Sequence, residues 1–334
     1  MRHHRVSRTA ELRCCLTGET YQQAYAALRR GQPPIPPAST AEQRNFEADV
    51  FDELLKSRNR FTEFTFGIRR IHPHPDTLKI EVESEQRATD LLHRLLPVYE
   101  LDTGEVYGLL GLRIRQISER GIELHICDRQ TSLWLTGLPP SAWRRITKNR
   151  PAELAPGWRS LWHNTGTWTA EEAASETQWN TPKWTQHFYD GAWCTSGLLR
   201  RLAAFHTVAP AYAVTGWKGL GIPGYGDKSP VRWCLEVDYR PGVPQHRDQL
   251  VGALTDPVFG LPLASAQHLD ASRGGPLPAH IVQLDDAGRT ALIELRSSIG
   301  MFDSLKKRHP DVDARIRNRV QRILTRHENW SRAV

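Results

Sequence analysis

Paired cysteine motifs are missing from this sequence. It has five cysteines (Cys14, Cys15, Cys127, Cys194 and Cys234), and no two of them are separated by two residues. A Cys-X-X-Cys zinc or redox site is therefore excluded. An odd and scattered set also argues against a disulfide framework and favours a reducing, cytoplasmic compartment.

Long apolar runs are missing as well. No uninterrupted stretch approaches the length needed to cross a bilayer, and no apolar segment follows the basic residues of the amino terminus, MRHHRVSRTAELR. The sequence therefore predicts a soluble protein with no membrane partner and no signal peptide. It also has no GxSxG, HExxH or Cys–His signature of a known hydrolase class.

Acidic residues are in deficit. The 334-residue chain has 44 lysines and arginines against 37 acidic residues, a net charge of +7 and a pI of about 9.3. The excess favours an anionic partner, nucleic acid first and DNA before RNA, because planar guanidinium groups suit phosphate. A basic pI is also common among soluble proteins, so charge alone does not decide the function.

Residues 1–31 are predicted to form a helical hairpin. The first helix covers residues 8–16, Gly18 suits a left-handed C-cap, and Thr20 with Gln23 forms a capping box that starts the second helix. The hairpin is either a DNA-reading helix–turn–helix unit or a docking module for a protein partner, and it lacks the third helix of the usual unit. The residues suited to bases and phosphates are Gln22, Gln23, Arg29 and Arg30.

A proline-rich linker follows at residues 32–40, within GQPPIPPAST, and marks the clearest domain boundary. Residues 41–150 are predicted to form an α+β domain. Apolar residues four apart indicate a helix to about residue 56, and alternating apolar residues then indicate strands of an antiparallel sheet around a leucine-rich helix. The predicted strands cover residues 64–68, 78–82, 110–117, 122–127 and 132–136, with the helix at 85–96.

The segment 151–195 is rich in tryptophan and poor in aliphatic residues. This composition is typical of a loop-rich lid or an aromatic platform, and nearby cations would complete a groove for single-stranded nucleic acid. The alternative is that buried tryptophans pin an irregular segment onto the core. The residues assigned to nucleic-acid binding here are Arg144, Arg145, Lys148, Trp162, Trp168, Lys183 and Trp184.

The C-terminal α+β domain, residues 196–334, begins with a helix at 196–205. A glycine-rich loop bearing Lys218 and Lys228 then precedes a strand at residues 231–239. Such a loop can cradle phosphate, although the spacing is not that of a P-loop and a kinked structural loop is the alternative. Glu236 and Asp238 occupy alternate strand positions and so share a face, where they could bind Mg²⁺ or Mn²⁺. The alternative is an ordinary exposed strand face.

A third carboxylate, Glu294 or Asp270, could complete such a metal site, and His280 lies between them on a predicted strand. Over residues 216–300 the chain resembles the archaeo-eukaryotic primase family, with Glu236, Asp238, His280 and Glu294 in the matching positions. The resemblance implies nucleotidyl-transfer chemistry with these four residues as catalytic candidates. The sequence departs from the family at Glu236, where aspartate is usual, and in the short gap after Lys228.

A basic amphipathic helix is predicted at residues 311–327. Its arginines would contact phosphate, or would simply cover a solvated surface helix. The four assigned to nucleic acid are Arg315, Arg319, Arg322 and Arg326.

The sequence as a whole predicts an α+β protein that recognises the phosphate backbone through arginine, with tryptophan stacking. The first alternative is a metal-dependent phosphoryl- or nucleotidyl-transfer enzyme centred on Glu236 and Asp238. The second is a non-catalytic adaptor for protein partners.

Overall fold

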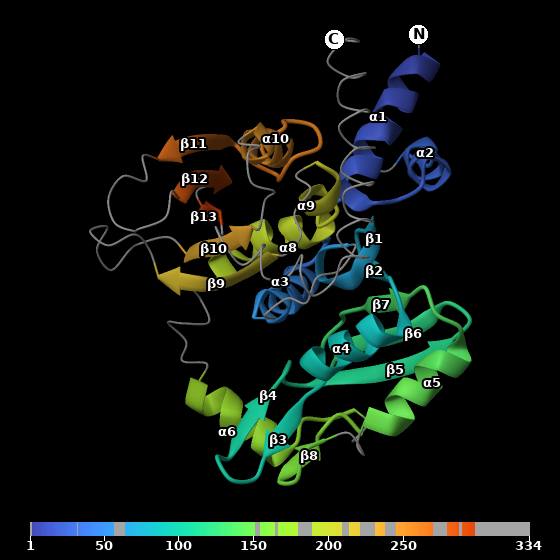
Figure 1. Cartoon of the computed structure of the whole chain (residues 1–334), viewed down its shortest axis with the longest axis vertical. Helices are drawn as coiled ribbons and strands as arrows, with labels where there is room; N and C mark the ends of the chain where they lie inside the picture. Colours follow the sequence, from blue (N-terminus) through green and yellow to red (C-terminus); the bar gives the residue numbers. More distant parts are fainter. Residues whose placement is uncertain are drawn as a thin grey trace, which may run out of the picture. The chain divides into compact units, whose positions relative to one another are not determined.

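The protein is built from two compact α+β units. The computed structural model describes residues 2–31, 33–56, 64–150, 154–163, 166–179, 189–208, 214–220, 231–237, 245–269, 279–286 and 289–297 (Figure 1). The first unit combines Met1–Pro34, Ser57–Gly67 and Arg201–Val334, and the second combines Ile35–Lys56 and Ile68–Arg200. No helix in the described part of the chain is long and apolar enough to cross a membrane.

Helices of the first unit include the predicted hairpin. Helix α1 (Arg2–Thr17) packs on α2 (Tyr21–Arg29) and on the short α9 (Ala204–Thr207), which in turn contacts α10 (Gln245–Leu254). The hairpin is thus part of a helical cluster whose other members come from much later in the chain.

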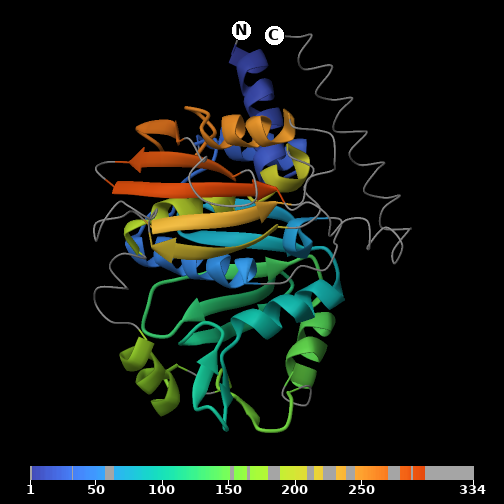
Figure 2. The ribbon, with the colours of Figure 1, turned by 60° about the vertical axis from the view of Figure 1, so that its left-hand side comes forward.

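The sheet of the first unit has the strand order β11-β12-β13-β10-β9, and its strands lie side by side in Figure 2. The strands are β9 (Val214–Leu220), β10 (Val231–Val237), β11 (Ser265–Leu269), β12 (Ala279–Asp286) and β13 (Arg289–Ser297). Four neighbouring residues of β13 (Ala291, Leu292, Ile293 and Leu295) are each at most 3% exposed, so this central strand is covered on both faces.

Two differences from the sequence prediction lie in this sheet. Residues 215–220, predicted as the start of a glycine-rich loop, form strand β9 antiparallel to β10. Gly216 and Gly219 lie inside this strand, where glycine has no side chain to pack and weakens the pairing. Strand β11 was not predicted at all.

The second unit has a helical core made by α3 (Ala41–Leu55) and α8 (Ala192–Arg200), which pack along each other. Phe46, Val50 and Leu54 on α3 are at most 2% exposed, which confirms the apolar stripe read from the sequence. Arg200 spans this core as a bidentate partner of Glu47, at 2.7 Å from Nε and 2.6 Å from Nη2.

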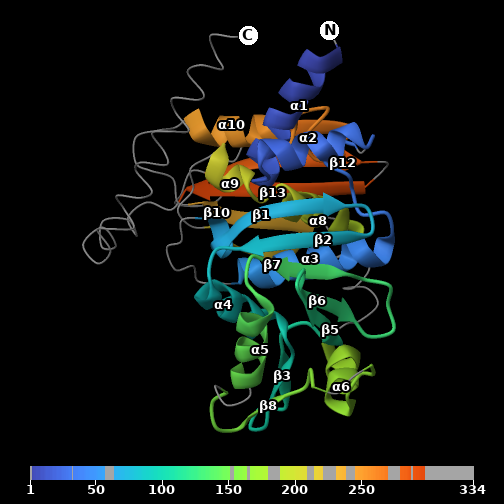
Figure 3. The same cartoon turned by 90° about the vertical axis from the view of Figure 1, so that its right-hand side faces the viewer.

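The larger sheet of this unit has the order β1-β2-β7-β6-β5. Its strands are β1 (Ile68–His74), β2 (Thr77–Val82), β5 (Leu112–Ser118), β6 (Gly121–Ile126) and β7 (Leu133–Thr136), and Figure 3 shows β1, β2 and β7 side by side. Helices α4 (Glu85–Leu95) and α5 (Pro140–Asn149) pack against each other and against strands of this sheet. In β2, buried Leu78 and Ile80 alternate with half-buried or exposed residues, as a strand with one covered face requires.

A second, three-stranded sheet was missed by the sequence prediction. It has the order β4-β3-β8, from β3 (Val98–Glu100), β4 (Glu105–Tyr107) and β8 (Trp158–Ser160). Helix α6 (Ala170–Trp179) follows, tied to β5 by the buried pair of Glu172 and Arg113 at 2.7 Å. The tryptophan-rich segment is therefore more regular than predicted.

One predicted strand start is also wrong. Residues 65–67 form a tight helical turn, η1 (Thr65–Gly67), with Phe66 at φ 58° and Gly67 at φ 70°, and the strand begins only at Ile68. The predicted helix at residues 311–327 lies outside the described residues.

Candidate nucleic-acid interface

The turn between α1 and α2 has the local structure that its sequence demands. Gly18 adopts φ 73°, and its N–H donates to the Cys14 carbonyl at 2.9 Å, which ends α1. Thr20 then caps α2 by accepting from the Gln23 N–H at 3.3 Å, while the Gln23 side chain accepts from the Thr20 N–H at 2.9 Å. This confirms the predicted capping box and fixes where α2 begins.

A buried ion pair holds the same turn from inside. Arg13 and Glu19 have side chains only 1% and 4% exposed and form a bidentate contact, with Arg13 Nη2 3.0 Å from Glu19 Oε1. Arg13 also donates to the Pro34 carbonyl at 3.0 Å, and the Thr17 hydroxyl donates to Glu19 Oε2 at 3.2 Å. Each charge therefore has several partners, which is the condition under which a buried pair is tolerated.

Helix α9 supplies the support that the hairpin lacks in its own sequence. It contacts α1, and the Thr207 hydroxyl donates to the Cys15 carbonyl. The third helical element, missing from residues 1–31, thus comes from residues 204–207.

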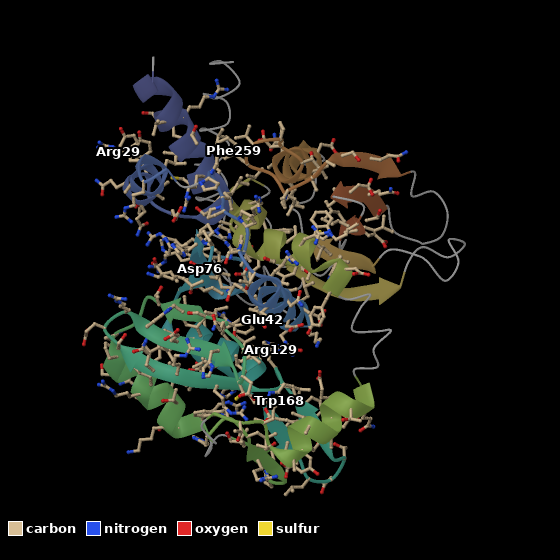
Figure 4. The ribbon with its side chains drawn as sticks, turned by 180° about the vertical axis from the view of Figure 1, so that it is seen from behind. Arg29, Glu42, Asp76, Arg129, Trp168 and Phe259 are labelled. Atoms are coloured by element: carbon tan, nitrogen blue, oxygen red, sulfur yellow. The ribbon has the colours of Figure 1, made fainter. Side chains whose placement is uncertain are left out.

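The outer face of α2 is polar and basic. Arg29 and Arg30 at its carboxyl end are exposed, whereas Ala24 is fully buried against the hairpin. Among the residues that the structure describes, no carboxylate lies within 4 Å of either guanidinium group. Figure 4 shows Arg29 on the outer side of α2. Gln22 near the start of the helix is exposed too, so hydrogen-bonding and charged side chains occur along the same helix.

An aromatic pair with one exposed ring lies on the same helix. Tyr21 is 43% exposed, and its ring stacks on that of Tyr25, with centroids 5.8 Å apart and an interplanar angle of 22°. The pair spans one helical turn, as residues four apart do. The stacking holds a flat ring surface at the start of α2.

Helix α5 has a second basic face, in the other unit. Its inner side is fixed by Trp143, which is fully buried and donates to the Leu138 carbonyl at 3.1 Å. Arg144 and Lys148 are exposed on the outer side, one turn apart. Arg145 is bound to Glu85 of α4 at 2.6 Å, and this contact lowers the pKa of Glu85 and raises that of Arg145.

Of the tryptophans predicted to form a stacking platform, the two that the structure describes are buried or half-buried. Trp162 is 7% exposed, so its ring belongs to the core and offers no stacking surface, in agreement with the alternative of buried tryptophans. Trp168 is half-buried, with its ring beside Gly111. Lys183 and Trp184 lie outside the described residues.

Three of the four candidate positions for catalysis lie in described strands of this sheet, and they are divided between its two faces. Positions 236 on β10 and 294 on β13 share a face, because Glu294 pairs with Cys234 and Glu236 pairs with Arg296 in the parallel ladder. His280 pairs with Leu295, so position 280 is on the opposite face. Glu294 is 3% exposed, and Asp238 lies outside the described residues. In the described part of the chain, no three His, Cys, Asp or Glu side chains form a group that could hold a metal ion.

Of the other predicted phosphate ligands, one lies within the described residues. Lys218 is in strand β9, where it pairs with Trp233 of β10. Those that lie outside the described residues are Lys228, Arg315, Arg319, Arg322 and Arg326.

The larger sheet also has a polar face, which can be recognised in the sequence of its strands. Arg70 binds Glu81 across the β1–β2 hairpin at 2.7 Å and 2.8 Å, and hydrogen bonding from His72 and then Arg70 lowers the pKa of Glu81 to about 2. Arg115 similarly binds Glu123 at 2.9 Å. The signal was the alternation of charged with apolar residues along these strands. Because these arginines are already matched by carboxylates, this face is less suited to phosphate than α2 is.

Comparison with known proteins gives no relative. No family model, no curated protein sequence and no solved structure matches this chain. The resemblance to primase domains therefore stays a prediction.

Proposed function

We propose that this protein binds nucleic acid, DNA first, through the α1–α2 hairpin, with α2 as the contacting helix. The observation that carries the proposal is a helix–turn–helix whose second helix exposes two arginines, with no carboxylate of the described residues within 4 Å of either guanidinium group. Helix–turn–helix units join two helices by a turn of three or four residues, often with glycine, and place the second helix on the nucleic acid. Here residues 18–20 make that turn.

The side chains on α2 divide by chemistry between phosphate and base contacts. Arg29 and Arg30 can each neutralise a phosphate and donate several hydrogen bonds to it. Gln22 is near the amino terminus of the helix, where recognition helices contact base edges, and glutamine pairs with adenine through its amide. Such contacts need a helix whose position is fixed, and the Arg13–Glu19 pair together with the capping box fixes α2 in this way.

Helix α5 is assigned the same role in the second unit. Trp143 and Ile146 anchor its inner side, which leaves Arg144 and Lys148 free to contact the backbone of a nucleic acid. Arg145 contributes less, because Glu85 already balances its charge. The proposal therefore ranks the two basic helix faces, with α2 first.

The test is the salt dependence of binding to duplex and single-stranded DNA, measured by fluorescence anisotropy. Each phosphate contact contributes about 0.9 to the slope of log K against log salt on duplex DNA. The Arg29→Ala/Arg30→Ala variant should therefore weaken binding and reduce the magnitude of the slope by about 1.8.

Two controls separate a specific contact from a change in net charge. Arg120→Ala removes an exposed charge from the turn between β5 and β6 and should leave the slope unchanged. Arg29→Lys/Arg30→Lys keeps the charge and should keep most of the slope, while lowering affinity where bidentate bonds matter. If the native protein shows no salt-sensitive binding to DNA or RNA, or if Arg120→Ala has the same effect as the α2 variant, the proposal fails.

A further inference from the structure

The small β4-β3-β8 sheet has the opposite charge to the rest of the chain. Residues 97–108 contain Glu100, Asp102 and Glu105 and no lysine, arginine or histidine, in a protein whose net charge is +7. None of the three acids has a basic side chain within 4 Å among the described residues. This segment therefore presents negative charge that the surrounding structure does not balance.

Two of these carboxylates are held against each other. Glu100 and Glu105 are directly opposite in the β3–β4 ladder, an arrangement that is destabilising for like charges. The Tyr107 hydroxyl lies between them, 2.8 Å from Glu105 Oε2 and 3.2 Å from Glu100 Oε2, and its single proton is shared by both acceptors. The Thr103 hydroxyl also donates to Glu100 Oε2, at 2.8 Å. Because both donors are neutral, a positive group placed beside the two carboxylates would relieve repulsion that the hydroxyl groups cannot.

An aromatic pair lies on the same face of the sheet. Trp158 is opposite Glu100 in the β3–β8 ladder, and its ring centroid is 5.0 Å from that of Tyr107 at an interplanar angle of 35°. Tyr107 is 42% exposed, so ring surface and carboxylates are presented together. We call Glu100, Glu105, Tyr107 and Trp158 the acidic–aromatic face.

The nearest arginine along these strands is directed elsewhere. Arg159 follows Trp158 and therefore points to the opposite face of β8. There it lies over the Tyr99 ring, 5.5 Å from its centroid, and binds Glu171 at 2.5 Å. The acidic–aromatic face is thus not covered by the cation that the sequence places next to it.

We propose that the acidic–aromatic face binds the ammonium group of a lysine side chain presented by a partner protein. An ammonium group carries three donors in a compact charge, so one group can bond to both carboxylates. The methylene stem of a lysine packs on aromatic surface, and the ring faces attract its charge. The negative charge of the two carboxylates attracts an ammonium group and repels phosphate. The site is therefore independent of the proposed nucleic-acid surface.

The experiment observes the indole N–H signal of Trp158 by NMR, assigned with the Trp158→Phe variant of the full chain. The probes are three capped tripeptides, Gly-Lys-Gly, the same peptide with an acetylated lysine, and Gly-Arg-Gly. The lysine peptide should shift the Trp158 signal in a saturable and salt-sensitive way, and the acetylated peptide should not. An equal response to the acetylated peptide, or an equal or larger response to the arginine peptide, would overturn the assignment to lysine.

Variants separate binding from folding. Glu100→Gln/Glu105→Gln keeps the shape of the face and should weaken the response to the lysine peptide at least tenfold, with the other indole signals unchanged. Glu119→Gln removes an exposed carboxylate in the turn between β5 and β6 and should have no effect. An undiminished response in the double variant refutes the site. DNA binding by the double variant should equal that of the native protein, so failure here is distinguishable from failure of the proposed function.

Discussion

Two exposed tyrosines show how neighbouring charges separate surfaces that are otherwise alike. Tyr21 on α2 is 43% exposed and Tyr107 on β4 is 42% exposed, and each lies against a second aromatic ring. Tyr21 begins a helix that ends in Arg29 and Arg30, whereas Tyr107 donates to two carboxylates. The same type of ring therefore has basic neighbours in one unit and acidic neighbours in the other, and we propose opposite partners for the two surfaces.

The two regions also differ in the burial and ion pairing of their acidic residues. In the hairpin, Glu19 is buried and paired with Arg13, so its charge is balanced inside the structure. In the small sheet, Glu105 is half-buried, and no basic side chain of the described residues lies within 4 Å of it. The buried carboxylate of Glu19 thus contributes to stability, whereas the carboxylate of Glu105 belongs to the proposed binding face.

The largest expected effect is on the buried carboxylate. Glu19→Gln leaves the Arg13 charge buried without its counter-charge, and removing one partner of a buried pair costs about 3–5 kcal/mol. Hydrogen exchange of the α1 and α2 amides should rise by the corresponding factor, and DNA binding should fall with it. Glu105→Gln, on the exposed face, should change stability by no more than about 0.5 kcal/mol.

A double variant checks the cause of that loss. Arg13→Met/Glu19→Leu removes both charges and fills the space with apolar atoms, so it should recover most of the protection lost in Glu19→Gln. If Glu19→Gln and Glu105→Gln have equal effects on hydrogen exchange, the contrast between the matched and the unmatched carboxylate is wrong.

The next effect concerns the hydroxyl proton of Tyr107, which lies between the carboxylates of Glu100 and Glu105. The hydrogen bond to Glu105, with burial and the charges of both glutamates, raises the pKa of Tyr107 from 10.0 to about 12. Because the folded-state pKa is raised, the stabilisation is fully present below pH 10 and is lost as the pH rises through about 12. Carbon-13 NMR of the tyrosine ring should show Tyr107 still protonated at pH 11.

Replacing one acceptor tests the source of this shift. In Glu105→Gln the pKa of Tyr107 should fall towards 10, and in Glu119→Gln it should not move. A Tyr107 that titrates like a free tyrosine in the native protein would mean that the two carboxylates are not held at its hydroxyl, and the acidic–aromatic face would lose its basis.

Local features of the hairpin could be predicted from the sequence, and contacts between distant residues could not. The capping box of Thr20 and Gln23 and the C-cap at Gly18 depend on residues within one turn, so their sequence pattern is sufficient. The support of α1 by Thr207 depends on a contact that no local pattern records. The hairpin could therefore be predicted, but its third helical element could not.

The small sheet shows the same limit more strongly. Its strands β3, β4 and β8 are each three residues long, too short for alternation to be distinguished from chance. Trp158 meets Glu100 only through the β3–β8 ladder. The sequence prediction treated Trp158 as one of several crowded tryptophans, because the acidic partner that gives it a role lies far away in the chain.

The smallest expected effect concerns Tyr21, the first of the two tyrosines compared above. If α2 contacts single-stranded DNA, a base can stack on Tyr21, and such stacking is worth about 1–3 kcal/mol by alanine substitution. Tyr21→Ala should therefore weaken binding to single-stranded DNA about tenfold, near the lower end of that range, whereas Tyr21→Phe keeps the ring and most of the affinity. Tyr107→Ala is the matched control, because it removes an equally exposed ring whose carboxylate neighbours repel phosphate. Equal losses from the two alanine variants in an anisotropy titration would show that exposure alone, and not the charge beside the ring, decides which tyrosine meets DNA.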